Sequence, residues 1–234
     1  MKTKITICAC ASRSFINKKQ LAELATVLEK RGFEVIIEED LCRLVEYNSK
    51  RLAEITESTI VACHERAVRN LMKYRGYQVD VVYDIRQNSV SAILNEMGVE
   101  GETAEADEKF TKMLEGMEPE TGEDAWFPVI DTERCVNCRK CQDFCLFGVY
   151  TLEGKQVKVL HPENCKNNCP ACARTCPKTA IIFPKYDQSP INGGLEDYGE
   201  LAIRVDTKAL YNQALRERLA HRRASTFIIN KEKK

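Results

Sequence analysis

Several classes of protein are excluded by what the sequence lacks. No apolar run approaches the roughly 20 residues that a membrane-spanning helix needs, so we expect no membrane span. The 35 basic and 35 acidic residues cancel, which leaves no overall charge to attract nucleic acid or an anionic membrane. The apolar stretch after the N-terminal lysines is only about seven residues long and has no convincing cleavage site, unlike a signal peptide. We therefore expect a cytoplasmic protein.

Signals for a bound nucleotide cofactor are also missing. The sequence has no GxGxxG or comparable phosphate-binding loop, and the segment after its first predicted strand, ASRSF (11–15), has no glycine. We expect this chain to bind neither flavin nor nicotinamide. It also shows no convincing catalytic acid or base, so no catalytic residue is predicted.

Cysteine, in contrast, is abundant, with 12 among 234 residues. Disulfides would explain this number in a secreted protein, but an export signal is missing. Reduced cysteines in such number usually bind metal, so their positions are the main guide to function.

Strand and helix patterns alternate over residues 1–98. Leu21, Leu24, Ala25 and Leu28, for example, share one helical face, and Asn17 is a suitable N-cap. Alternation of this kind predicts an α/β domain with a parallel sheet covered on both faces, Rossmann-like or flavodoxin-like. The predicted strands are 4–10, 33–40, 58–65 and 77–85, and the predicted helices are 17–32, 48–56, 66–76 and 89–98.

Two further segments carry weaker patterns. Residues 99–125 are rich in acidic side chains and predict a solvated linker, with a possible helix at 107–117. Residues 188–234 begin with a loop rich in glycine and proline. They continue into an expected helix at 207–225 and end in a basic tail.

An internal repeat fills the region between these segments, residues 126–187. Residues 127–145 align with 157–176, and each copy holds four cysteines. The first copy has the spacing C-x2-C-x2-C-x3-C. The second has C-x3-C-x2-C-x3-C, with one extra residue in its first loop, and ends in Cys176–Pro177.

Residues 126–187 resemble the bacterial two-[4Fe–4S] ferredoxin domain, a small α+β fold. Three closely spaced thiolates hold one cluster in that family, while the fourth cysteine of the run binds the other cluster. Separated CxxC pairs would favour the alternative of two zinc sites, but these are unbroken four-cysteine runs. The resemblance implies that one cluster is bound by Cys135, Cys138, Cys141 and Cys176, and the other by Cys165, Cys169, Cys172 and Cys145.

This region departs from the family in two places. Leu146 follows Cys145 where the family often has proline, and the second copy has the longer first loop. Neither change removes a ligand, although the longer loop can alter hydrogen bonds to its cluster. We expect Phe147 and Tyr150 to pack near a cluster and exclude water.

The remaining four cysteines lie in the first domain, each at or just after the end of a predicted strand. The carboxyl ends of parallel strands meet at one sheet edge, where ligands bind. We therefore expect a third [4Fe–4S] cluster at this edge. Zinc, a redox-active dithiol and simple core packing remain alternatives. The expected ligands are Cys8, Cys10, Cys42 and Cys63.

About the first 90 residues resemble the N-terminal iron–sulfur domain of the heterodisulfide reductase A subunit. The resemblance lies in the CxC that ends the first strand, the cysteine after the second strand, and TIVAC (59–63). It implies an iron–sulfur centre, whereas the flavin domain of that family has no counterpart here. His64, beside Cys63, is a candidate for tuning this site, although a structural role at a helix start is the commoner case.

These patterns together predict an iron–sulfur electron-transfer protein or subunit. It would pass single electrons through two, and we expect three, [4Fe–4S] clusters to or from a redox partner such as a flavoprotein. The alternative is an enzyme subunit that reduces a disulfide or thiol substrate at the first-domain cysteines.

Overall fold

The computed structural model describes residues 3–99, 104–117 and 124–194 of the chain. These described residues form one compact unit. The helix expected at 207–225 and the basic tail lie outside the described residues, as does most of the segment 188–234. No helix in the described ranges is long and apolar enough to cross a membrane.

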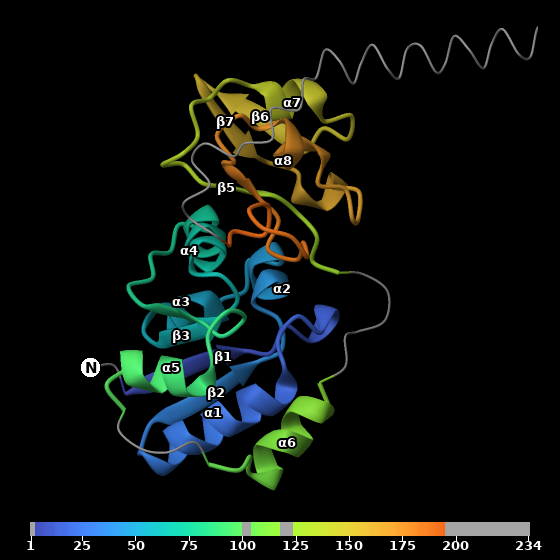
Figure 1. The fold of residues 1–234 in the computed structure, drawn as a ribbon. Helices are drawn as coiled ribbons and strands as arrows, with labels where there is room; N and C mark the ends of the chain where they lie inside the picture. The colour runs from blue at the N-terminus through green and yellow to red at the C-terminus, as the bar shows by residue number, and fades with distance from the viewer. Residues whose placement is uncertain (1–2, 100–103, 118–123, 195–234) are drawn as a thin grey trace, which may run out of the picture. The chain divides into compact units, whose positions relative to one another are not determined.

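A four-stranded parallel sheet forms the centre of the first half, as the alternating pattern predicts (Figure 1). Its strand order is β2-β1-β3-β4, the order of flavodoxin-like sheets, in which the chain reverses direction across the sheet between β1 and β3. The strands are β1 (Lys4–Cys8), β2 (Glu34–Glu38), β3 (Thr59–Ala62) and β4 (Val82–Asp84).

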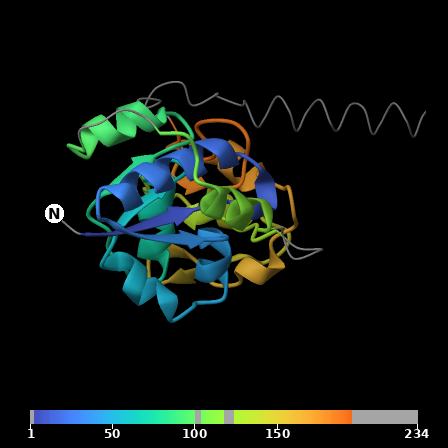
Figure 2. The same cartoon turned by 90° about the horizontal axis from the view of Figure 1, so that it is seen from below.

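Helices cover both faces of this sheet (Figures 1 and 2). On one side, α1 contacts α5 and α6, and on the other α2 contacts α3 and α4. Ile5, Ile7 and Ile60 of the central strands are fully buried between these layers. The helices of this half are α1 (Lys18–Lys30), α2 (Leu41–Glu46), α3 (Arg51–Thr56), α4 (Glu65–Tyr74) and α5 (Val90–Glu96).

Helix caps explain where two of these helices begin. The Asn17 side chain accepts a hydrogen bond from the backbone N–H of Lys19, so the predicted N-cap of α1 is confirmed. Asp40 caps α2 in the same way through the backbone N–H of Arg43. No helix is expected at α2 from the sequence, and this short helix places Cys42 in its first turn.

The fourth strand is shorter than predicted, 82–84 rather than 77–85. The guanidinium of Arg69 donates hydrogen bonds to the carbonyls of Val79 and Asp80, at 2.7 and 2.8 Å. Because a side chain binds these two carbonyls, residues 77–81 remain a loop.

Two short antiparallel strand pairs and two short helices form the second half, consistent with its internal repeat. Each cysteine run continues into one helix, and the two helices contact each other. The elements are β5 (Val129–Ile130), α7 (Lys140–Phe144), β6 (Tyr150–Glu153), β7 (Gln156–Val159), α8 (Ala171–Thr175) and β8 (Ile181–Ile182).

The acidic segment is not a purely solvated connector. Its expected helix is present as α6 (Glu108–Glu115), which packs against α1. Phe110 and Leu114 are buried in the core, because their spacing of four residues places both on the face toward α1. This part of the segment therefore belongs to the α/β layer structure.

Truncating Leu114 tests this packing. We expect Leu114→Ala to lower the free energy of unfolding by about 2–5 kcal/mol, because it leaves a cavity beneath α6. Met113→Ala, at an exposed neighbouring position, is the control and should change it little. Denaturant unfolding followed by circular dichroism measures both, and equal effects would show that α6 is not part of the core.

Candidate metal centres

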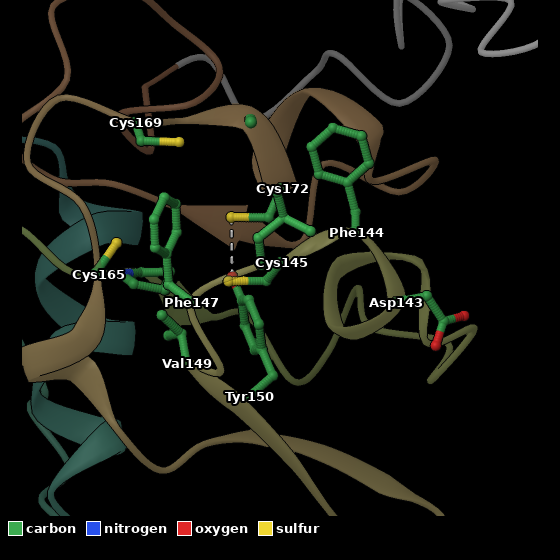
Figure 3. A pocket seen from close by; sticks show the side chains of 12 residues that line it. Asp143, Phe144, Cys145, Phe147, Val149, Tyr150, Cys165, Cys169 and Cys172 are labelled. Atoms are coloured by element: carbon green, nitrogen blue, oxygen red, sulfur yellow. Dashed lines mark hydrogen bonds between the residues drawn. The ribbon is translucent and has the colours of Figure 1, made fainter. Parts of the chain in front are cut away.

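Four cysteines from both copies of the repeat line one cavity of about 410 Å³ (Figure 3). Three of them come from the second run, and the fourth is the last cysteine of the first run. This is the crossed combination that the ferredoxin resemblance implies. The four are Cys145, Cys165, Cys169 and Cys172.

Tyr150 lies at this cavity, as predicted, and contacts one of its thiols. The phenol O–H of Tyr150 donates a hydrogen bond to Sγ of Cys172, with an oxygen–sulfur distance of 3.0 Å (Figure 3). Burial raises the pKa of Tyr150 well above its ordinary value, and the Cys172 thiol adds to the effect. The phenol therefore stays protonated and able to donate. Phe147, also predicted near a cluster, lines the same cavity while remaining partly exposed.

The other four cysteines of the repeat line a separate, narrower hollow. Here the last cysteine of the second run, Cys176, joins the first three of the first run. Its sulfur accepts a hydrogen bond from the backbone N–H of Ala180 at 3.2 Å. The members of this group are Cys135, Cys138, Cys141 and Cys176.

An asparagine with positive φ precedes the second cysteine of each run. Asn137 has φ 51° and Asn168 has φ 60°, a region that asparagine tolerates better than most residues. The Asn137 carbonyl oxygen accepts from the backbone N–H of Val157. The Asn168 carbonyl oxygen, in the longer loop, instead accepts from the guanidinium of Arg13 at 2.5 Å. The longer loop thus contacts the first half of the chain.

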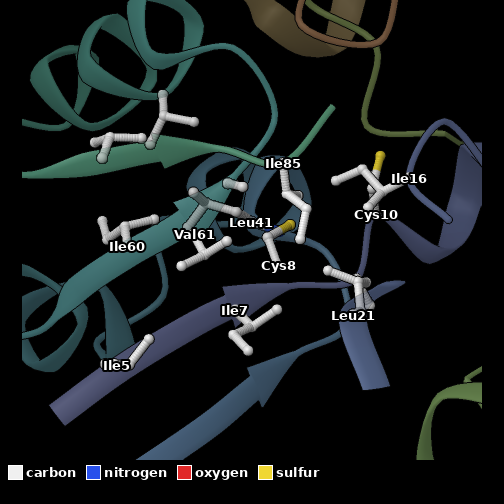
Figure 4. Close-up of a cluster of buried hydrophobic side chains, with 14 of the residues drawn as sticks. Ile5, Ile7, Cys8, Cys10, Ile16, Leu21, Leu41, Ile60, Val61 and Ile85 are labelled. Atoms are coloured by element: carbon white, nitrogen blue, oxygen red, sulfur yellow. The ribbon is translucent and has the colours of Figure 1, made fainter. Parts of the chain in front are cut away.

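The first-half cysteines gather at the carboxyl edge of the parallel sheet. Cys8 is the last residue of β1, with Cys10 just beyond it (Figure 4). Cys42 lies in the first turn of α2, and Cys63 directly follows β3. Two of these strands, β1 and β3, flank the point where the chain reverses across the sheet, the usual ligand position in such folds.

Cys10 adopts an unfavourable backbone conformation. Its φ of 49° and ψ of 44° are left-handed, which costs a residue with a Cβ roughly 1–2 kcal/mol. Strain of this kind persists where the surrounding structure holds it in place, often at functional sites.

The four first-half thiols interact with one another electrostatically. Burial raises the pKa of Cys10 to about 11 and that of Cys63 to about 12, and it raises those of Cys8 and Cys42. Neighbouring thiols add to these shifts. Cys10 raises the pKa values of the other three thiols, and Cys63 raises those of Cys8 and Cys42. The four side chains therefore lie near one another within the core of the first half.

Charged side chains around this group were not predicted from the sequence. The ammonium of Lys185, only 2% exposed, is bound to Asp40 and Ser12. Arg86 faces Cys10 and Cys63 and lowers their pKa values, whereas Asp84 raises that of Cys63. A helix-cap pattern at Asp40 was available in the sequence, but nothing there connects Lys185 with residues about 145 positions away.

The histidines have mainly structural contacts. His64 precedes α4, and its Nδ1 lies 2.8 Å from a carboxylate oxygen of Asp84. His161 is exposed and pairs with Glu163 at 3.1 Å. The tuning role considered for His64 stays a prediction.

The donor sets fit iron–sulfur chemistry. Thiols alone make up each group of four, and thiolates are the usual ligands of [4Fe–4S] clusters. Hydrogen bonds from Tyr150, Ala180 and the Leu41 backbone reach three of the sulfurs. In the described parts of the chain, no three His, Cys, Asp or Glu side chains are arranged to hold a single metal ion. A cluster is wider than one ion, and its ligands stand correspondingly further apart.

Comparison with known proteins gives matches to ferredoxins. No family model matches the chain. An uncharacterized ferredoxin of Methanocaldococcus jannaschii is 35% identical over 116 residues, which cover 41% of this chain and 79% of that protein. Ferredoxin-3 of Nostoc sp. is 34% identical over 92 residues, covering 30% of this chain and 89% of the relative. The chain belongs to the ferredoxin family.

Membership in the ferredoxin family supports an iron–sulfur electron-transfer role. Each alignment covers less than half of this ferredoxin. The likeness of its first half to the heterodisulfide reductase A subunit stays a prediction.

The contact between Tyr150 and Cys172 generates a test. Hydrogen bonds to ligand sulfur stabilise the reduced, more negative cluster, so Tyr150→Phe should lower the reduction potential of one cluster without loss of iron. An EPR-monitored redox titration measures the shift. Tyr186→Phe is the matched control, because the Tyr186 hydroxyl accepts a hydrogen bond from the guanidinium of Arg174. Equal potentials in Tyr150→Phe and wild type would contradict the role of the hydrogen bond.

Proposed function

We propose that this ferredoxin-family protein passes single electrons through three [4Fe–4S] clusters, two in residues 126–187 and one in residues 1–98. The crossed grouping of the eight repeat cysteines carries this proposal. When bound, each cluster supplies a site that accepts and releases one electron. The chain itself supplies the ligands, the exclusion of water and the electrostatic environment.

The two-cluster part rests on two separate groups of thiols. Cys145 of the first run lies with the first three cysteines of the second run. Cys176 of the second run lies with the first three cysteines of the first run. Such an exchange is typical of two-cluster ferredoxins, in which the fourth cysteine of a run binds the other cluster. The proposed ligand sets are therefore those implied by the resemblance.

The third cluster rests on the four thiols that gather at the sheet edge. Four neighbouring thiols, the left-handed backbone at Cys10 and two nearby cations are more than core packing requires. The heterodisulfide reductase resemblance points to the same four residues. The proposed ligands are Cys8, Cys10, Cys42 and Cys63.

Contacts between the two halves support electron transfer within one chain. Arg66 of α4 is buried, and its Nε lies 2.7 Å from a carboxylate oxygen of Asp131. The same guanidinium donates to the carbonyl of Thr179 at 2.6 Å. Thr179 is three residues from Cys176, so a rigid contact connects the first half with a ligand loop of the second.

The rival proposal, thiol-disulfide chemistry at the first-half cysteines, needs a reactive thiolate. Burial instead raises the pKa of each of these four thiols, which disfavours a free thiolate in the absence of a bound metal. This favours electron transfer to a partner, such as a flavoprotein, over substrate reduction. A cytoplasmic location also remains part of the proposal.

Metal analysis tests the number of clusters. Anaerobically purified protein should contain about twelve irons and as many sulfides, falling to about eight in Cys8→Ser/Cys10→Ser. Ala9→Ser/Ala11→Ser is the control, because it alters two buried residues of the same segment and removes no thiol. It should keep about twelve irons. A value near eight in wild type would reject the third cluster.

EPR spectra test the crossed ligand sets. Cys145→Ser and Cys169→Ser should perturb one reduced-cluster signal, although they lie in different runs. Cys138→Ser and Cys176→Ser should perturb the other. If Cys145→Ser instead altered the same signal as Cys138→Ser, each run would bind its own cluster and the crossed assignment would be wrong.

A further inference from the structure

Lys185 connects the end of the ferredoxin-like region with the first-half thiols. It belongs to the second half of the chain, just after β8, yet its side chain is buried at the carboxyl edge of the parallel sheet. There its ammonium is bound to the Asp40 carboxylate and to the Ser12 hydroxyl. Ser12 also donates to Asp40 at 2.7 Å, so the three polar groups satisfy one another.

The segment around Lys185 is held in place at a second point. Arg86, which follows β4, donates hydrogen bonds to the carbonyls of Tyr186 and Asp187 at 3.3 and 3.0 Å. Further along, Gly193 passes so close to α4 that an added Cβ would lie 2.7 Å from the Cβ of Ala67. Residues 185–194 therefore pack against the edge where the four thiols gather.

The ammonium acts directly on that thiol group. Its two partners lie in the ligand loops, because Asp40 is two residues from Cys42 and Ser12 is two residues from Cys10, so the buried ammonium lies close to both thiols. Burial alone would lower the pKa of Lys185, but Cys42 and Asp40 raise it above its ordinary value. The side chain is therefore a permanent cation at neutral pH.

A buried cation beside thiolate ligands has a predictable effect on redox chemistry. Four thiolates make the site negative, and one-electron reduction adds a further negative charge. Inside a protein such charge is costly unless opposite charge compensates it. A fixed positive charge stabilises the reduced state more than the oxidised state, and charge is among the factors that set cluster potentials.

We propose that Lys185 is a positioning residue of the first-half cluster and raises its reduction potential. This inference rests on the proposed third cluster. It also makes the first-half site composite, because its four ligands come from residues 8–63 and its principal counter-charge comes from residue 185. The electron that reduces the site comes from the ferredoxin clusters of the same chain, which are oxidised in return.

The test is a redox titration of the full-length protein, followed by EPR and reduced chemically with dithionite. The relevant signal is the one that disappears in Cys8→Ser/Cys10→Ser. In Lys185→Met its reduction equilibrium should become at least tenfold less favourable, a fall of about 59 mV for one electron. Lys185→Arg keeps the charge and should restore the wild-type value. The two ferredoxin signals serve as internal references and should not move.

Arg51→Met is the matched control. Arg51 pairs with Glu38 at 2.5 Å, close to the same strand end, but its side chain is 57% exposed. Loss of this ion pair should leave the first-half potential unchanged, because solvent screens an exposed charge.

A second variant is needed if Lys185→Met does not bind the third cluster. Asp40→Asn removes a negative charge while keeping a side chain that caps α2 equally well, so it should raise the potential. An unchanged potential in Lys185→Met would overturn the role of Lys185. If Lys185→Met lacks the third cluster, an unchanged potential in Asp40→Asn would overturn it instead. A wild type without a third signal would reject the third cluster itself, a result that iron content near eight identifies separately.

Discussion

In a sheet whose strands all run in one direction, every strand ends at the same edge. Much of the first half depends on this constraint. Residues far apart in sequence, such as Cys8 and Cys63, need no special folding to approach each other, because β1 and β3 are hydrogen-bonded neighbours. The chain reverses across the sheet between these two strands, which opens the edge to a ligand. A thiol after each neighbouring strand is then enough to form a group.

The second constraint is charge. A group of buried thiolates is unstable without cations, and the first half places its cations by two different routes. Arg86 is local, two residues beyond β4. Lys185 arrives from the other half of the chain, paired with Asp40. The ion pair Arg66–Asp131 joins the same two halves at another buried point. The first-half thiol site is therefore part of the joint between the halves, and its properties depend on both.

The sequence was sufficient for features that local patterns encode. Hydrophobic periodicity predicts the parallel sheet and α1, with its cap at Asn17, whereas the crossed cysteine groups are implied by the resemblance to two-cluster ferredoxins. The sequence was insufficient where a contact between residues far apart in the chain determines the local structure. The short β4 depends on the Arg69 side chain, and the packing of α6 depends on the apolar face of α1. Lys185 lies in a stretch with no motif, so only the folded chain reveals its place beside Cys42.

The longer loop between Cys165 and Cys169 has a physical explanation of the same kind. In sequence it is a departure from the ferredoxin spacing. In the structure Asn168 of this loop binds Arg13, which also pairs with Asp124 at 2.6 Å and stacks over Trp126. Arg13 is three residues from Cys10, so this contact connects the ligand loops of the two halves. The longer loop is thus part of the joint between the halves, while the asparagine turn that both runs share remains in place within it.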